Sequence, residues 1–194
     1  MVARKKAKLK TRKVVGEKNS PRKEKVKAVF SGEEVLSSAK EARDLYSQSY
    51  FGEYINGKIH YALVEALYLV DREKLEVFVK TKKLNFDGLM NKCKSLDSKI
   101  LIKFLVYRDL RNRGYLLKTA LKFGADFRVY EKGSKIGKEH SKWLLYCVSE
   151  AGELTWHDFS AKNRVAHSTN KNLLVSVVDN EGGITYYEIR WIRP

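Results

Sequence analysis

Three side chains with different acid–base properties are the candidates for chemistry in this sequence: Tyr130, His140 and Lys171. Tyr130 ends residues 126–130, where alternating apolar and polar side chains predict a strand. His140 closes the loop that follows this strand, and Lys171 comes directly after a predicted helix. We expect all three where strands emerge into solvent, because a rigid sheet can aim side chains at such positions into a cleft.

A phenol, an imidazole and an ammonium group together suit the cleavage of RNA by its own 2′-hydroxyl. A base removes the 2′-hydroxyl proton, an acid protonates the leaving 5′-oxygen, and a cation stabilises the charge that grows on the phosphoryl oxygens. In this interpretation Tyr130 is the base, His140 the acid and Lys171 the cation. Because the ordinary pKa of tyrosine is ~10, Tyr130 needs help from a neighbouring Lys or Arg. The reaction needs no metal and no other cofactor.

Each candidate also has a structural explanation. Tyr130 is one of 11 tyrosines, and a strand tyrosine usually serves packing. A loop histidine such as His140 is usually only solvated, and Lys171 is one basic residue among 39. The spacing of the three residues is therefore a suggestion only. The other histidines are interpreted as structural or solvated: His60, His157 and His167.

Metal chemistry has little support in the sequence. Asp126 with Glu131 and Lys132 imitates a magnesium nuclease site only loosely, since Glu131 alternates away from Tyr130 along the strand. Two cysteines provide neither a disulfide framework nor a zinc site. Cys147 lies in an apolar run, which is typical of a buried core residue. We therefore expect no bound metal.

The charge of the chain favours a polyanionic partner. The 194 residues carry 39 Lys and Arg against 23 Asp and Glu, a net charge of +16. Twelve of the basic residues fall within residues 1–27, which predicts a disordered tail with salt-sensitive phosphate contacts. No apolar segment approaches the ~18 residues of a membrane span, and the N-terminus lacks a signal peptide. We expect a cytoplasmic protein with no membrane partner.

The elements that must position the candidate residues predict a mixed α/β (α+β) fold. We expect a small N-terminal α+β domain at residues 28–90, and a C-terminal mixed-sheet α/β nuclease domain at residues 91–194. The boundary falls around residues 86–97. Asn-Gly within residues 54–59 predicts a hairpin. The other N-terminal predictions are a strand at 28–30, a helix at 33–49 and helical segments at 63–70 and 75–78.

The C-terminal half begins with a predicted helix and continues mainly as strands. Ser95 or Asp97 caps this helix, which stops before Gly114. Its buried side carries Ile100, Leu101, Phe104, Leu105 and Leu110. The later predicted elements are strands at 115–121, 127–130 and 143–148, a helix at 160–169, and strands at 173–178 and 184–192.

Several motifs in fixed order extend over about 90 residues. They read VYRDLRNRGY at 106–115, KFGADFRVY at 122–130, HS at 140–141, RVAHS at 164–168, Lys171, ITYYE at 184–188 and RWIRP at 190–194. In these motifs the chain resembles the archaeal-type tRNA-splicing endonucleases (tRNA-intron lyases). The N-terminal half agrees more loosely, through Gly57 and residues 65–69, and residues 1–27 match no known pattern.

The resemblance implies that Tyr130, His140 and Lys171 align with the catalytic triad of the family. It implies cleavage of precursor tRNA at bulge–helix–bulge motifs, leaving a 2′,3′-cyclic phosphate and a 5′-hydroxyl. It also implies that Arg164 and Trp191 grip a bulged base by cation–π stacking, which has little sequence preference. Two alternatives stay open: a structural subunit that only positions RNA, and a general basic nucleic-acid-binding module.

The resemblance further implies an assembly, because both strands of the bulge–helix–bulge are cut and one chain of this length provides one site. Single-length members of the family resemble homotetramers, in which an acidic loop of one subunit docks in a basic pocket of another. Asp179 and Glu181 match that loop. Gly183 stands where a further acidic residue is common, so a heterotetramer with a related chain stays open.

Overall fold

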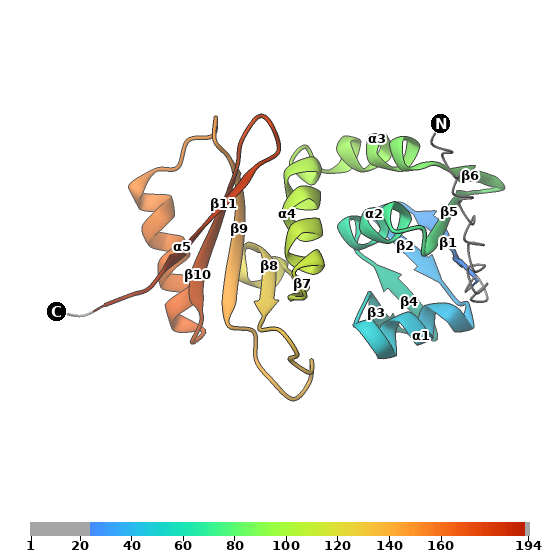
Figure 1. Ribbon diagram of the computed structural model, residues 1–194, viewed down its shortest axis with the longest axis horizontal. Helices are drawn as coiled ribbons and strands as arrows, with labels where there is room; N and C mark the ends of the chain where they lie inside the picture. Colours follow the sequence, from blue (N-terminus) through green and yellow to red (C-terminus); the bar gives the residue numbers. More distant parts are fainter. Residues whose placement is uncertain (1–23, 193–194) are drawn as a thin grey trace, which may run out of the picture.

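Two β-sheets, one in each half of the chain, make up the architecture of this computed structural model (Figure 1). The structure describes residues 24–192, so most of the predicted basic tail lies outside the described residues. Helices α3 (Phe86–Leu96) and α4 (Ile100–Asn112) connect the sheets, with α3 in the stretch of the expected boundary. The expected α/β class, with an N-terminal and a C-terminal domain, is confirmed. Within residues 24–192 no helix is long and apolar enough to cross a membrane.

The N-terminal sheet has six strands in the order β3-β4-β2-β1-β5-β6. The predicted hairpin at Asn56 and Gly57 is confirmed, since both residues have positive φ (47° and 81°), as a tight two-residue turn requires. The strands are β1 (Val26–Ser31), β2 (Glu34–Ser37), β3 (Glu53–Ile55), β4 (Lys58–Tyr61), β5 (Leu75–Val79) and β6 (Lys82–Leu84), with helices α1 (Lys40–Ser49) and α2 (Leu63–Asp71).

Two N-terminal predictions are wrong. The expected helix at 33–49 begins only at Lys40, because Val35 lies in β2 and is fully buried between β1 and β4. The expected helical segment at 75–78 is strand β5, which pairs in parallel with β1 and buries Leu75 and Val77. Short apolar runs fit both a helix and a strand, and pairing with β1 decided the outcome for both segments.

The helix predicted before Gly114 is confirmed as α4. The predicted cap was wrong: Lys99 occupies the N-cap position without a side-chain cap, Ser95 lies in α3, and the Asp97 side chain accepts the Lys99 N–H at 2.9 Å just before the helix starts. Ile100, Phe104 and Leu110 are buried as expected, but Leu101 is 41% exposed. The expectation for Leu101 was wrong because each helical residue turns by about 100°, which carries it off the buried side.

The C-terminal sheet has five strands in the order β11-β10-β9-β8-β7. Its predicted strands are confirmed, although the last ends at Ile189 rather than at residue 192. The predicted helix begins earlier than residue 160 and links the parallel strands β9 and β10. The elements are β7 (Leu116–Ala120), β8 (Ala125–Tyr130), β9 (Trp143–Ser149), α5 (Trp156–Ser168), β10 (Asn172–Val178) and β11 (Ile184–Ile189).

A helix covers each face of the C-terminal sheet. Helix α4 lies between the two sheets, and its Tyr107 ring packs 5.6 Å from Phe127 of β8 (Figure 1). One buried core therefore extends through both halves of the chain, and it includes Cys147, free and buried as predicted. Helix α5 covers the opposite face, where its Ala166 joins Leu144 and Leu173 in a second cluster.

Candidate active site

The neighbouring strands β8, β9 and β10 have ends that lie side by side in the C-terminal sheet. We call this end of the sheet the sheet edge. Trp143 of β9 pairs with Val129 of β8 and with Asn172 of β10. The Lys142 N–H donates to the Val129 carbonyl and the Asn172 N–H donates to the Lys142 carbonyl, both at 2.9 Å. The ladder of hydrogen bonds therefore continues one residue past Trp143.

The next row of this ladder consists of Tyr130, Lys142 and Lys171. Because neighbouring strands lie ~4.8 Å apart, the Cα atoms of Tyr130 and Lys171 are separated by about 10 Å. Arg128 pairs with Leu144 of the α5-facing cluster, and Tyr130, two residues later, shares that face. Lys171 shares the same face, since it precedes buried Leu173 by two residues. The sheet thus brings Tyr130 and Lys171 to one edge and one face.

His140 lies two residues before this row, in the loop between β8 and β9, and it is exposed. The loop closes through a single bridge between Ile136 and Glu139. Tyr130 differs from the expectation, because only 5% of its surface is exposed. Leu116 of β7 pairs with Tyr130 of β8. Tyr130 is therefore still inside the sheet and does not emerge into solvent.

Lys171 is aimed by the turn that ends α5. Asn170 takes a left-handed conformation (φ 53°), and the Lys171 N–H donates to the Ala166 carbonyl at 2.9 Å. The ammonium group then donates to the Thr169 carbonyl at 2.8 Å and lies 5.7 Å from the centre of the Phe123 ring. Partial burial, and secondly the positive charge of Arg128, lower the pKa of Lys171.

The two predicted base-gripping residues lie at the same end of α5. Trp191 follows β11, and its indole stacks on the imidazole of His167, with ring centres 5.2 Å apart and planes 20° apart. Arg164 and His167 are three residues apart on α5 and share one face of the helix. Ile189, the last residue of β11, pairs with Leu173, so Trp191 lies two residues beyond that pair and Lys171 two residues before it in the chain.

The predicted docking residues Asp179 and Glu181 lie at the other end of β10, in the loop to β11. The Asp179 carboxylate accepts the N–H groups of Glu181 (2.9 Å) and Gly183 (2.7 Å). A side chain at position 183 would collide with this carboxylate. Asp179 would therefore have to move its carboxylate to admit a side chain at position 183.

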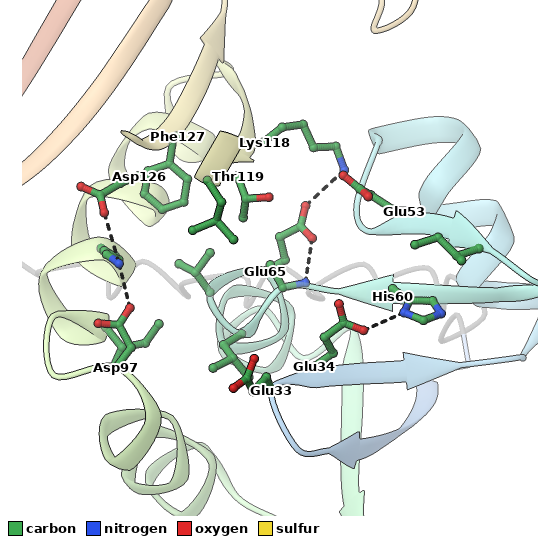
Figure 2. Close-up of a pocket in the computed structure, with 17 residues that line it drawn as sticks. Glu33, Glu34, Glu53, His60, Glu65, Asp97, Lys118, Thr119, Asp126 and Phe127 are labelled. Atoms are coloured by element: carbon green, nitrogen blue, oxygen red, sulfur yellow. Dashed lines mark hydrogen bonds and ion pairs between the residues drawn. The ribbon is translucent and has the colours of Figure 1, made fainter. Parts of the chain in front are cut away.

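A cleft of about 400 Å³ lies where the two halves of the chain meet, and neither Tyr130 nor Lys171 lines it. Figure 2 shows the side chains that line this cleft. The buried Lys118 of β7 donates to the Gly52 carbonyl at 2.5 Å and pairs with Glu65 of α2 at 3.4 Å. Lys103 lies 2.8 Å from Asp97 and 3.2 Å from Asp126. Both lysines of the cleft are thus neutralised by carboxylates.

The magnesium alternative finds no support in this geometry. Asp126 is engaged by Lys103 and by the Cys147 N–H at 2.8 Å. Glu131 pairs instead with Lys142, so the two carboxylates serve different contacts. No group of three or more His, Cys, Asp or Glu side chains gathers as a metal site within the described part of the chain.

Two residues near the site were missed from the sequence. Arg128 was placed on the Tyr130 face of the strand but given no role, and its charge acts on Lys171. His167 was interpreted as structural or solvated, and it instead contacts Trp191. For His167 the sequence did contain a signal: it follows Arg164 by three residues, which puts both side chains on one face of a helix.

Comparisons with known proteins agree with both halves of this architecture. Residues 26–90 match the family described as tRNA intron endonuclease, N-terminal domain, and residues 100–186 match tRNA intron endonuclease, catalytic C-terminal domain. A tRNA-splicing endonuclease of Thermococcus onnurineus is 42% identical over 172 residues, which cover 88% of this chain and 99% of the relative. That of Pyrococcus horikoshii is 40% identical over the same coverage.

A tRNA-splicing endonuclease of Methanothermobacter thermautotrophicus is 40% identical over 168 residues, which cover 84% of this chain and 96% of the relative. The resemblance seen in the sequence motifs is thereby confirmed across both domains. The chain belongs to the tRNA-splicing endonuclease family and is an enzyme, with the N-terminal domain and the catalytic C-terminal domain of a tRNA intron endonuclease.

Proposed function

We propose that this enzyme excises introns from precursor tRNA by cleaving bulge–helix–bulge motifs without a metal, leaving 2′,3′-cyclic phosphate and 5′-hydroxyl ends. The observation that carries the proposal is the shared edge of β8, β9 and β10. Tyr130 and Lys171 lie in one row and on one face there, and His140 lies two residues outside the row. A base, an acid and a cation are the groups that this reaction requires.

Each group has one role in the proposed reaction. The Tyr130 oxygen takes the proton of the 2′-hydroxyl, and the 2′-oxygen attacks the adjacent phosphorus. The bond from phosphorus to the 5′-oxygen breaks while His140 donates a proton to that oxygen. Lys171 stabilises the charge on the non-bridging oxygens, and its partial burial strengthens this interaction.

The test is cleavage of a bulge–helix–bulge RNA in excess EDTA. We expect wild-type protein to cut at both bulges and His140→Ala to cut about 10²–10⁴-fold more slowly with binding retained. His157→Ala, which removes an exposed histidine at the other end of α5, is the matched control and keeps the wild-type rate. Loss of all cutting in EDTA would contradict metal independence. Binding without cutting by the wild type would instead indicate a non-catalytic subunit.

A second part of the proposal is assembly into a tetramer, because two cuts need two sites held at a fixed separation. Asp179 and Glu181 are both exposed, and Asp179 also closes its own loop, so Glu181 is the residue that can be changed without disturbing that loop. Glu181→Arg should shift sedimentation toward smaller species, whereas Glu153→Arg, an exposed loop control, should not. If the wild-type chain sediments as a smaller species by itself, a heterotetramer with a related subunit replaces the homotetramer.

A further inference from the structure

The contact between His167 and Trp191 is unusual because both residues are exposed. Trp191 is 42% exposed and lies beyond the end of β11, where the sheet no longer holds its backbone. Its indole nevertheless lies nearly parallel to the imidazole, with planes 20° apart and ring centres 5.2 Å apart. Offset stacking of this kind is a favourable arrangement for two flat rings.

The side chain of the residue before Trp191 is linked to the sheet by a charged contact. Arg190 donates from Nε to a carboxylate oxygen of Glu188 at 3.1 Å, and Asn172 of β10 donates to the same oxygen at 2.6 Å. This contact restrains the Arg190 side chain. It does not fix the rotation of the indole, which two side-chain torsions control. The stack on His167 supplies that second restraint.

One end of α5 therefore joins the proposed base grip to the catalytic edge. Arg164 and His167 share a face of the helix, and the turn that follows the helix aims Lys171. A flat base can stack on only one side of an indole whose other side is already covered. The imidazole thus leaves Trp191 a single open face.

We propose that His167 is a positioning residue, which holds the Trp191 ring so that its free face receives a bulged base of the RNA. This inference rests on the proposed function and on the expectation, implied by the family resemblance, that Trp191 stacks on that base. The benefit is pre-organisation: a ring that is already ordered loses less conformational entropy when the RNA binds. His167 itself touches neither the scissile phosphate nor the base.

The first measurement is steady-state cleavage of a bulge–helix–bulge RNA by His167 variants. His167→Ala should raise KM about three- to tenfold, the range expected when one side chain must be ordered on binding, with a smaller change in kcat. His167→Phe, which keeps a flat ring, should restore KM to near the wild-type value. His157→Ala removes an exposed histidine from the same helix and should leave KM unchanged.

Two further comparisons separate positioning from other roles. In a Trp191→Ala background, His167→Ala should cause no further rise in KM, because the imidazole then has no ring to hold. In the free protein, acrylamide quenching of the Trp191 fluorescence, isolated by subtracting matched Trp191→Phe spectra, should increase in His167→Ala and not in His167→Phe.

Each other outcome would overturn the inference. A lower KM in His167→Ala would mean that the imidazole occupies the place of the base and competes with the RNA. Additive effects of the two alanine variants, or unchanged quenching, would mean that His167 acts without Trp191. These results are distinct from failure of the proposed function, which would appear as a wild-type protein that does not cleave the RNA.

Discussion

Lysines at the junction between the two halves and at the edge of the C-terminal sheet differ in whether they pair with carboxylates. At the junction Lys118 is 7% exposed and pairs with Glu65, and Lys103 lies between Asp97 and Asp126. At the sheet edge no carboxylate of residues 24–192 forms an ion pair with Lys171. The lysines of the junction are thus paired with carboxylates, whereas Lys171 at the sheet edge is not.

The pKa values of two lysines show the same contrast. Burial alone would lower the pKa of Lys103, but hydrogen bonds and charge from Asp97 and Asp126 outweigh it, and the net pKa is raised. Burial also lowers the pKa of Lys171, and there the neighbouring Arg128 adds to the lowering. The same physical cause therefore gives opposite results, depending on whether a carboxylate is within reach.

The largest expected effect is on folding, from Lys118→Met. The change leaves the Glu65 carboxylate buried with only the N–H groups of Gly52 and Ala62, each at 3.2 Å. We expect the free energy of unfolding to fall by about 3–5 kcal/mol, measured by denaturant titration. Replacing both partners, as Lys118→Met with Glu65→Gln, should recover part of the loss. Equal stability of the single variant and wild type would contradict the pairing.

Lys171→Ala should give the complementary result at the sheet edge. We expect RNA cleavage to fall about 10²–10³-fold, because a cation at the transition state is removed. The free energy of unfolding should change little, since no ion pair is lost. Lys94→Ala, an exposed lysine on α3, removes the same charge without affecting the rate. A large loss of stability with normal cleavage per folded molecule would reverse the assignments of the two regions.

Asp97→Asn tests the junction through pH. Burial opposes ionisation of Asp97, but hydrogen bonds from Lys103 and the Lys99 N–H outweigh it and lower its pKa. A carboxyl with a lowered folded pKa stabilises the protein above its unfolded pKa of ~3.9, and the stabilisation disappears as pH falls through the folded value. Wild type should exceed the variant by about 1.5 kcal/mol at neutral pH. Unfolding at a series of pH values should show the difference shrinking below pH ~4.

Arg128→Met should have the smallest effect. Removing the guanidinium should raise the pKa of Lys171. A pH titration of the Lys171 side-chain NMR signals measures this pKa. The pKa should stay below the ordinary lysine value, because burial is the larger cause of the lowering and is retained. An unchanged pKa would mean that Lys171 does not sense Arg128.

Patterns among neighbouring residues correctly predicted the helices and turns that such residues determine by themselves. Helix α4 follows from apolar residues at helical spacing and a stop at Gly114, and the β3–β4 hairpin from Asn56 and Gly57. Strands β2 and β5 were missed because their identity depends on pairing with β1, which for β5 lies more than 40 residues away in the chain. Periodicity over a few apolar residues carries no information about such partners.

The candidate site was predicted in the same uneven way. Residue types and motif order selected Tyr130, His140 and Lys171, and they remain candidates whose roles the experiments above test. The neighbours were harder to foresee: Arg128 acts on Lys171 across two strands, and Trp191 meets His167 on a helix. These contacts depend on register and on which face of the sheet α5 covers.

The sequence by itself determined the family, most of the helices and strands, and the chemical groups that the reaction would use. Tertiary structure alone decided that Tyr130 is buried, that Lys118 pairs with a carboxylate while Lys171 pairs with none in the described part of the chain, and that the rings of His167 and Trp191 stack. The physical reason is distance along the chain. Helix spacing and turns arise among neighbouring residues, whereas burial, charge pairing and stacking arise when strands far apart in sequence align.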